Sequence, residues 1–162
     1  MELNDRIHKW LHSKGIYDYD LCDGVVHVVG SVDLYGLGLT RIPVQFGYVS
    51  GYFSCGRNDL TSLEGCPSEV GGDFLCSYSR LSSLAGGPKE VGVVYDCSNN
   101  NLESLEGAPC EVGGDFDCCY NPLESLEGCP SEVGGDFKCR GNPFNVEPDV
   151  SGIRIGGEFA WK

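Results

Sequence analysis

Hydrophobic positions recur along most of this chain with a period of 21 residues. Two leucine columns, a valine column, an aromatic column and a cysteine column keep their residue type from one unit to the next. Self-similarity at a fixed period of this size is typical of a solenoid, in which each unit is one coil. The columns are Leu60, Leu81, Leu102 and Leu123; Leu63, Leu84, Leu105 and Leu126; Val70, Val91, Val112 and Val133; Phe74, Tyr95, Phe116 and Phe137; and Cys55, Cys76, Cys97, Cys118 and Cys139.

Each unit begins with a short stretch in which the aromatic and cysteine side chains alternate with other residues. Phe74 and Cys76, for example, alternate with Asp73, Leu75 and Ser77. A period of two residues is the pattern of a half-buried strand. The sequence therefore predicts one strand in each coil, near Ser31–Tyr35, Gly51–Cys55, Gly72–Ser77, Val93–Ser98, Gly114–Cys119 and Gly135–Arg140.

A small polar residue follows each cysteine of the ladder by three positions. A buried Asn at a bend can bond the backbone groups that a turning chain leaves unpaired. The Gly-Gly pair that precedes Phe74, Phe116 and Phe137 allows a sharp turn into the next strand. The polar column is Asn58, Ser79, Asn100, Asn121 and Asn142.

The first 29 residues depart from the repeat. Leu3, Ile7, Trp10 and Leu11 stand at helical spacing, which predicts an amphipathic helix over residues 3–13. Asp23-Gly24 lies between two β-rich runs and predicts a hairpin over residues 17–29. Because the terminal repeats of a solenoid need covering, we expect residues 1–29 to form an N-terminal cap.

The repeat also frays near the C-terminus. About five units fill residues 30–142, and the segment from residue 143 to 162 is predicted to be a C-terminal cap. Within it, G-G-E-F-A-W repeats the strand motif with an offset of 22 residues. The chain of 162 residues is expected to be a single domain.

The unit F-x-C-x-x-N-x-L-x-x-L resembles the leucine-rich repeat, whose shared pattern is L-x-L-x-x-N/C-x-L-x-x-L. It is similar to the short bacterial class of these repeats, and to cysteine-rich "SLEGCP…VGGDF.C..N" arrays of phage and bacterial genomes. This resemblance, over roughly residues 30–160, implies an α+β repeat solenoid with a parallel β-sheet on its concave face and a helix-poor convex face. It also implies that the concave face binds a protein.

Composition indicates the expected solubility of the chain, its compartment and the redox state of its cysteines. No apolar run approaches the roughly 18 residues of a membrane span. Five of the ten cysteines occupy one inward column, where a free thiol behaves as a small hydrophobic side chain. We therefore expect a soluble, cytoplasmic protein with reduced cysteines, existing as a monomer or a weak homodimer.

Candidate chemistry is sparse, and we expect neither an enzyme nor a cofactor or metal. His8 and His12 are four residues apart, which is half of a zinc site, but no third ligand accompanies them in the sequence. Packing or surface roles are favoured for both. Cys118-Cys119 invites a redox interpretation, but with Cys118 pointing inward Cys119 is expected to be an exposed, incidental thiol.

The informative surface is the outward side of the predicted sheet. Inward positions keep their type from coil to coil while the outward ones vary, as when one frame is reused to display different side chains. The predicted partner-binding residues are Tyr52, Ser54, Asp73, Leu75, Ser77, Val94, Asp96, Ser98, Asp115, Asp117, Cys119, Asp136, Lys138 and Arg140.

Charge is the second functional feature. The formal net charge is −13, and one column is entirely acidic: Glu69, Glu90, Glu111 and Glu132. Nucleic-acid binding is disfavoured because it needs cations against the phosphates. The acidic column instead favours a protein partner with a basic patch.

The leading hypothesis is therefore a non-catalytic, plausibly phage-encoded module that binds and inhibits or sequesters a bacterial host or defence protein. One alternative is an acidic DNA mimic that occupies a DNA-binding enzyme. The other is a structural or assembly component.

Overall fold

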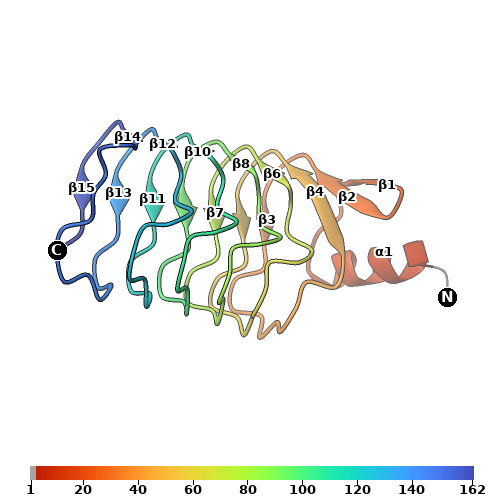
Figure 1. Cartoon of the computed structure of the whole chain (residues 1–162). Coiled ribbons are helices and arrows are strands. Elements are labelled where there is room, and N and C mark those ends of the chain that lie inside the picture. The colour runs from red at the N-terminus through yellow and green to blue at the C-terminus, as the bar shows by residue number, and fades with distance from the viewer. Residues whose placement is uncertain (1–2) are drawn as a thin grey trace.

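The computed structural model describes residues 3–162, which form an elongated solenoid of about six turns with one helix at its N-terminal end (Figure 1). Successive coils stack side by side, and the C-terminus lies at the end opposite the helix. Strands of equivalent coils pair in parallel and build two sheets, one of seven strands and one of eight. The repeat architecture predicted from the 21-residue period is confirmed.

The seven-stranded sheet, sheet B, contains the strands that the alternating pattern predicts. They are β3 (Val32–Asp33), β5 (Phe53–Ser54), β7 (Phe74–Leu75), β9 (Tyr95–Asp96), β11 (Phe116–Asp117), β13 (Phe137–Lys138) and β15 (Phe159–Ala160). Neighbours pair in strict register, for example Phe53 with Phe74 and Phe74 with Tyr95. Equivalent residues of successive coils therefore lie beside one another, as a solenoid requires.

A second sheet, sheet A, was not predicted apart from its two hairpin strands. It contains β1 (Asp20–Cys22), β2 (Val25–Val28), β4 (Gln45–Val49), β6 (Glu69–Val70), β8 (Glu90–Val91), β10 (Glu111–Val112), β12 (Glu132–Val133) and β14 (Arg154–Ile155). β1 pairs antiparallel with β2, and the other strands pair in parallel. Most of these strands have only two residues, too few to show a period along the chain. Their pairing with the neighbouring coils defines them, so the expectation of a single sheet was wrong.

Glycines form the corner between the two sheets. A Cβ at Gly92 would lie 2.1 Å from the carbonyl oxygen of Gly71, and one at Gly113 would lie 2.0 Å from that of Gly92. Such contacts are far closer than van der Waals distance. The glycine that directly follows Val70, Val91, Val112 or Val133 is therefore needed because the coils approach one another too closely there for any side chain.

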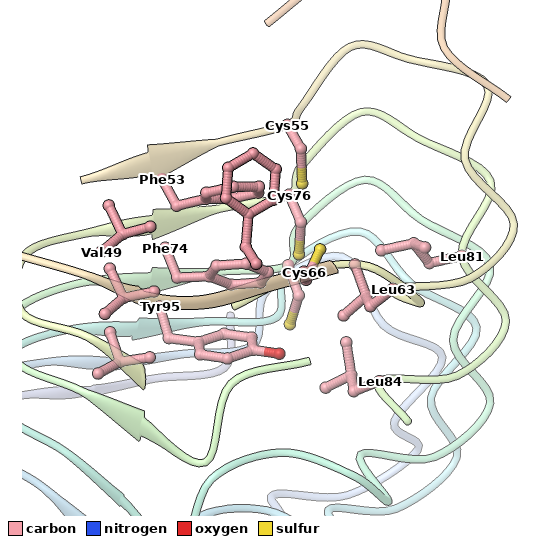
Figure 2. Close-up of a cluster of buried hydrophobic side chains, with 14 of the residues drawn as sticks. Val49, Phe53, Cys55, Leu63, Cys66, Phe74, Cys76, Leu81, Leu84 and Tyr95 are labelled. Atoms are coloured by element: carbon pink, nitrogen blue, oxygen red, sulfur yellow. The ribbon is translucent and has the colours of Figure 1, made fainter. Parts of the chain in front are cut away.

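The core is a series of ladders that run along the solenoid axis (Figure 2). The aromatic rings of sheet B form a continuous stack, with centroids 6.0 Å apart between Phe53 and Phe74 and 5.1 Å apart between Phe74 and Tyr95. The cysteine ladder and the first leucine column lie beside it and are fully buried. Since each coil repeats the same layer, burial of these side chains provides the main stabilisation of the solenoid.

Asparagine side chains hold the bend that follows each strand of sheet B. The Asn100 amide donates to the carbonyls of Cys76, Cys97 and Ser98, and its oxygen accepts from Leu81 N at 3.1 Å. Asn58 and Asn121 make the equivalent bonds. These bonds connect adjacent coils and satisfy buried backbone groups, as the polar column predicted.

The N-terminal end is covered by helix α1 (Leu3–Ser13) and the β1–β2 hairpin. Ile7 and Leu11 are the buried residues of the helix, and Gly15, at φ 75°, follows its last turn. Asp23 and Gly24 both have positive φ, the geometry of a type I′ turn. Trp10 packs edge-on against Phe46 and so extends the aromatic ladder into the helix.

Near the C-terminus, β14 and β15 add one more rung to both sheets. Glu132 pairs with Arg154 and Phe137 with Phe159, which is the offset of 22 residues seen in the sequence. Phe144, Ile153 and Trp161 pack against the core but remain partly exposed. Part of the segment predicted as a C-terminal cap thus continues the stack.

Candidate functional site

The outer face of sheet B presents the side chains that alternate with the buried aromatic and cysteine ladders. Leu75 lies beside Asp96, Asp96 beside Asp117, and Asp117 beside Lys138, each pair in register on adjacent strands. The structure thus brings residues 21 positions apart onto one continuous surface. The predicted partner-binding residues all lie on or next to these strands.

Exposure across this face is uneven. Tyr52 and Arg140 are exposed, and most of the other predicted residues are half-buried. Ser54 and Ser98 are buried although they point outward. Ser54 is a short side chain between Asp33 and Leu75 on the adjacent strands. Both serines contribute little to the accessible surface.

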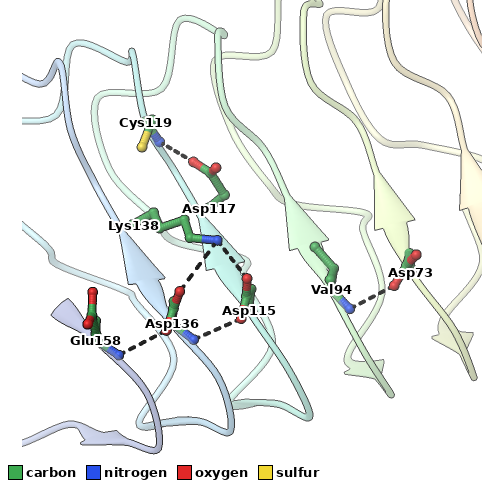
Figure 3. A network of polar contacts seen from close by, with 8 residues as sticks. All are labelled: Asp73, Val94, Asp115, Asp117, Cys119, Asp136, Lys138 and Glu158. Atoms are coloured by element: carbon green, nitrogen blue, oxygen red, sulfur yellow. Dashed lines mark hydrogen bonds and ion pairs between the residues drawn. The ribbon is translucent and has the colours of Figure 1, made fainter. Parts of the chain in front are cut away.

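Three aspartates on this face accept hydrogen bonds from the backbone of the following coil (Figure 3). Asp73 accepts from Val94 N at 3.1 Å, Asp115 from Asp136 N at 2.8 Å, and Asp136 from Glu158 N at 2.9 Å. Each uses one carboxylate oxygen in this way. These side chains therefore connect adjacent coils as well as lining the outer face.

Lys138 is clamped between two of these carboxylates (Figure 3). Its Nζ lies 2.6 Å from Asp115 Oδ2 and 3.7 Å from Asp136 Oδ2. The hydrogen bond to Lys138, with the one from Asp136 N, lowers the pKa of Asp115, and the hydrogen bond to Asp115 raises the pKa of Lys138. The lysine thus neutralises part of an otherwise acidic C-terminal half of the face.

Cys119 differs from its prediction. It was expected to be an exposed thiol, but it is only 7% exposed, and its sulfur accepts a hydrogen bond from Arg140 N at 3.2 Å. Burial and the neighbouring Asp117 raise the pKa of this thiol to about 12. Burial likewise raises the pKa of the ladder thiols of Cys76, Cys97 and Cys118, so these groups are poor nucleophiles at neutral pH.

Two exposed tyrosines at the edge of this face were not predicted. Tyr78 and Tyr120 occupy one column, both with φ near 55°, and each is 61% exposed. The ring of Tyr120 packs closely over Gly141, since a Cβ at Gly141 would lie 2.4 Å from Tyr120 Cδ1. Their place in the sequence could have indicated the two tyrosines, because Tyr78 and Tyr120 directly follow the outward residues Ser77 and Cys119. Arg57 and Asn99 of the same column are polar, so the column shows no constant aromatic type.

The acidic column lies on sheet A, away from the outer face of sheet B. Glu69 pairs with Glu90, and Glu111 with Glu132, so the carboxylates follow one another up the stack. They line an open groove together with Lys89, Cys110 and the corner glycines. Glu132 is partly neutralised by Arg154, whose Nη1 lies 3.0 Å from Glu132 Oε2. The two acidic regions can therefore be altered independently.

Across residues 3–162, no group of three or more His, Cys, Asp and Glu side chains is arranged to hold a metal ion. Of the helices in this part of the chain, none is both long and apolar enough to cross a membrane. In comparisons with known proteins, no family model matches the sequence, and no curated protein or solved structure is significantly similar to it.

Proposed function

We propose that this protein is a non-catalytic protein-binding module that contacts its partner through the outer face of sheet B. The observation that carries the proposal is the contrast between the two sides of one sheet. Inward columns repeat the same buried residue types, whereas the outward column reads Ser54, Leu75, Asp96, Asp117 and Lys138 across adjacent strands. A constant core with varied outward side chains fits specific binding to the surface of one partner protein.

The composition of this face supports a protein partner rather than a nucleic acid. Its N-terminal half carries Tyr52, Leu75 and Tyr78, and aromatic side chains are enriched among residues that dominate protein interfaces. Its C-terminal half carries Asp96 and Asp117, which favour a cationic group on the partner. Phosphate backbones would be repelled by the same carboxylates.

We also propose that the solenoid is of the leucine-rich-repeat kind. The leucine columns and the asparagine bonds between coils support this assignment. The resemblance to cysteine-rich phage and bacterial arrays extends the proposal to inhibition or sequestration of a bacterial host or defence protein.

Affinity capture from a bacterial lysate with matched variants tests the binding face. Leu75→Arg/Asp117→Arg alters the outer face of sheet B, and Glu90→Gln/Glu111→Gln alters only the acidic column of sheet A. We expect to capture one protein in stoichiometric amount, and we expect it to stay bound through a high-salt wash. It should be lost with the first variant and kept with the second. With purified partner, the loss in affinity should be about 30-fold or more for a central contact.

The alternative of DNA mimicry is favoured by the glutamates that pair in register along sheet A. Against it, strands of a sheet are about 4.8 Å apart, whereas phosphates of one DNA strand are about 3.4 Å apart along the axis. Mimicry would replace the proposal if the captured proteins are DNA-binding enzymes that elute with salt. Their capture should then be lost with Glu90→Gln/Glu111→Gln and unchanged with Leu75→Arg/Asp117→Arg. If neither variant changes the captured set, the assembly role is favoured.

A further inference from the structure

Two histidines of helix α1 converge on one tyrosine oxygen at the N-terminal end of the molecule. His8 Nδ1 is in hydrogen-bond contact with the Tyr19 hydroxyl, and His12 Nε2 lies 3.5 Å from the same oxygen. The two imidazole rings have centroids 6.4 Å apart and belong to adjacent turns of the helix. The third group comes from the segment between the helix and β1, so the cluster joins two elements.

The donor types fit a borderline divalent transition metal. Imidazole nitrogen is a preferred ligand of Zn²⁺, Cu²⁺ and Ni²⁺, and residues four apart on a helix stand close enough to share one ion. Zn²⁺ binds imidazole nitrogen at about 2.0–2.1 Å, and open sites commonly use three protein donors and a water. Both nitrogens contact the Tyr19 oxygen, so an ion would enter this cluster in place of the hydroxyl proton that now lies among the three donor atoms.

We propose that His8, His12 and Tyr19 form a binding site for a divalent transition metal such as Zn²⁺ or Ni²⁺. His8 binds through Nδ1, His12 through Nε2, and Tyr19 through its phenolate oxygen, with water completing the shell. The ion takes the place of the proton that the Tyr19 hydroxyl carries, and that proton is released to solvent. Since imidazole must be neutral to bind a metal, acid weakens the complex.

Metal binding would fix the helix to the segment that leads into the hairpin. Tyr19 is partly buried against the core, whereas both histidines are exposed on the helix. A bound ion would therefore hold α1 against the N-terminal coil.

Calorimetric titration with ZnCl₂ and NiCl₂ tests the site. The titration uses the full chain with Cys22→Ser and Cys110→Ser, because these two exposed thiols would otherwise compete for metal. One ion per chain is expected, with release of a proton. His8→Gln and His12→Gln should each weaken binding by at least about tenfold, since changes to second-shell partners alone have effects of that size. Lys9→Gln, on the same exposed helix, should bind as the parent does.

Tyr19→Phe separates the three-donor site from a two-histidine chelate. A loss of affinity and of proton release in this variant supports the assignment of Tyr19. An affinity unchanged by Tyr19→Phe overturns that assignment, and binding that is absent or unaffected by both histidine variants overturns the site. Amide hydrogen exchange of α1, measured with and without Zn²⁺, gives a second readout, in which slower exchange is expected only when both histidines are present.

Discussion

At the scale of single residues, the polar column shows how one substitution breaks an otherwise regular network. Asn58, Asn100 and Asn121 each bond carbonyls of two coils and accept a backbone N–H. Ser79 occupies the same column between Asn58 and Asn100, and its buried hydroxyl has no hydrogen-bond partner. The shorter side chain does not reach the carbonyls, so this coil lacks bonds that its neighbours make.

Ser79→Asn is therefore expected to stabilise the protein. The amide would complete the column, bonding the carbonyls of Cys55 and Cys76 and accepting from Leu60 N, as the flanking asparagines do for their coils. Net hydrogen-bond contributions predict a gain of about 1–2 kcal/mol in the free energy of unfolding. Urea denaturation measures it, with the exposed Ser82→Asn as a control that should leave the midpoint unchanged. A lower midpoint for Ser79→Asn would contradict the proposed role of the column.

The ion pair of Asp115 and Lys138 makes stability depend on pH. The pKa of Asp115 is lowered in the folded protein, so its stabilising contribution is present above the usual carboxyl pKa of about 3.9 and is lost as pH falls through the lower folded value. The pKa of Lys138 is raised, so the contribution of the lysine is present below about pH 10.4 and is lost as pH rises through the higher folded value.

Lys138→Met should flatten both ends of this pH dependence. Because both groups are about one-third exposed, solvent screening keeps the effect modest. Thermal denaturation between pH 2.5 and 11 measures it, and Arg80→Met serves as the control, since Arg80 forms a more exposed ion pair with Asp59. Parallel curves for the parent and Lys138→Met would show that the pair contributes nothing measurable.

At the scale of the element, the glycine corner determines how closely the coils can stack. Gly71, Gly92, Gly113 and Gly134 stand where a Cβ would lie 2.0–2.4 Å from the carbonyl oxygen of the preceding coil. The requirement comes from the neighbouring backbone and not from a positive φ. A side chain at this corner would force two coils apart and so weaken the hydrogen bonds of both sheets.

Gly113→Ala should therefore destabilise the solenoid by about 1–3 kcal/mol, the usual cost of overpacking, or by more if the backbone cannot shift. Gly152→Ala is the matched control, since a Cβ there would meet no atom within 4 Å. Chemical denaturation of the two variants measures the difference. Equal midpoints would mean that the coils separate at little cost.

At the scale of the whole molecule, each coil contacts chiefly its neighbours, so the coils depend on one another for stability. The aromatic ladder runs from Phe46 through the stack to Phe159. Stability in such an array is approximately the sum of the coil energies and the interfaces between neighbours. Damage to a central coil removes two interfaces at once.

Leu105→Ala in a central coil should cost about 2–5 kcal/mol. Leu126→Ala, in the same column but only partly buried, should cost less. Denaturant midpoints compare the two, and hydrogen exchange should show faster opening of the coils on both sides of Leu105. An unchanged midpoint for Leu105→Ala would refute the inward position of this column.

The sequence by itself determined the features that repeat with the period. Equivalent residues of successive coils are neighbours in space, so the Leu, Cys, aromatic and Asn columns, the strands of sheet B and the side that each residue faces could be predicted from spacing alone. Each such residue packs against the residue of the same column in the coil before it and the coil after it. The contact can therefore be predicted from the 21-residue period.

Only the tertiary structure decided the contacts between positions that are not equivalent. The two-residue strands of sheet A exist because neighbouring coils pair there, and Cys119 is buried because Arg140 and Asp117 lie against it. The meeting of His8 and His12 with Tyr19 depends on how the segment after α1 folds back onto the helix. These contacts are set by the cross-section of the coil and the path of the N-terminal segment, which a period along the chain does not encode.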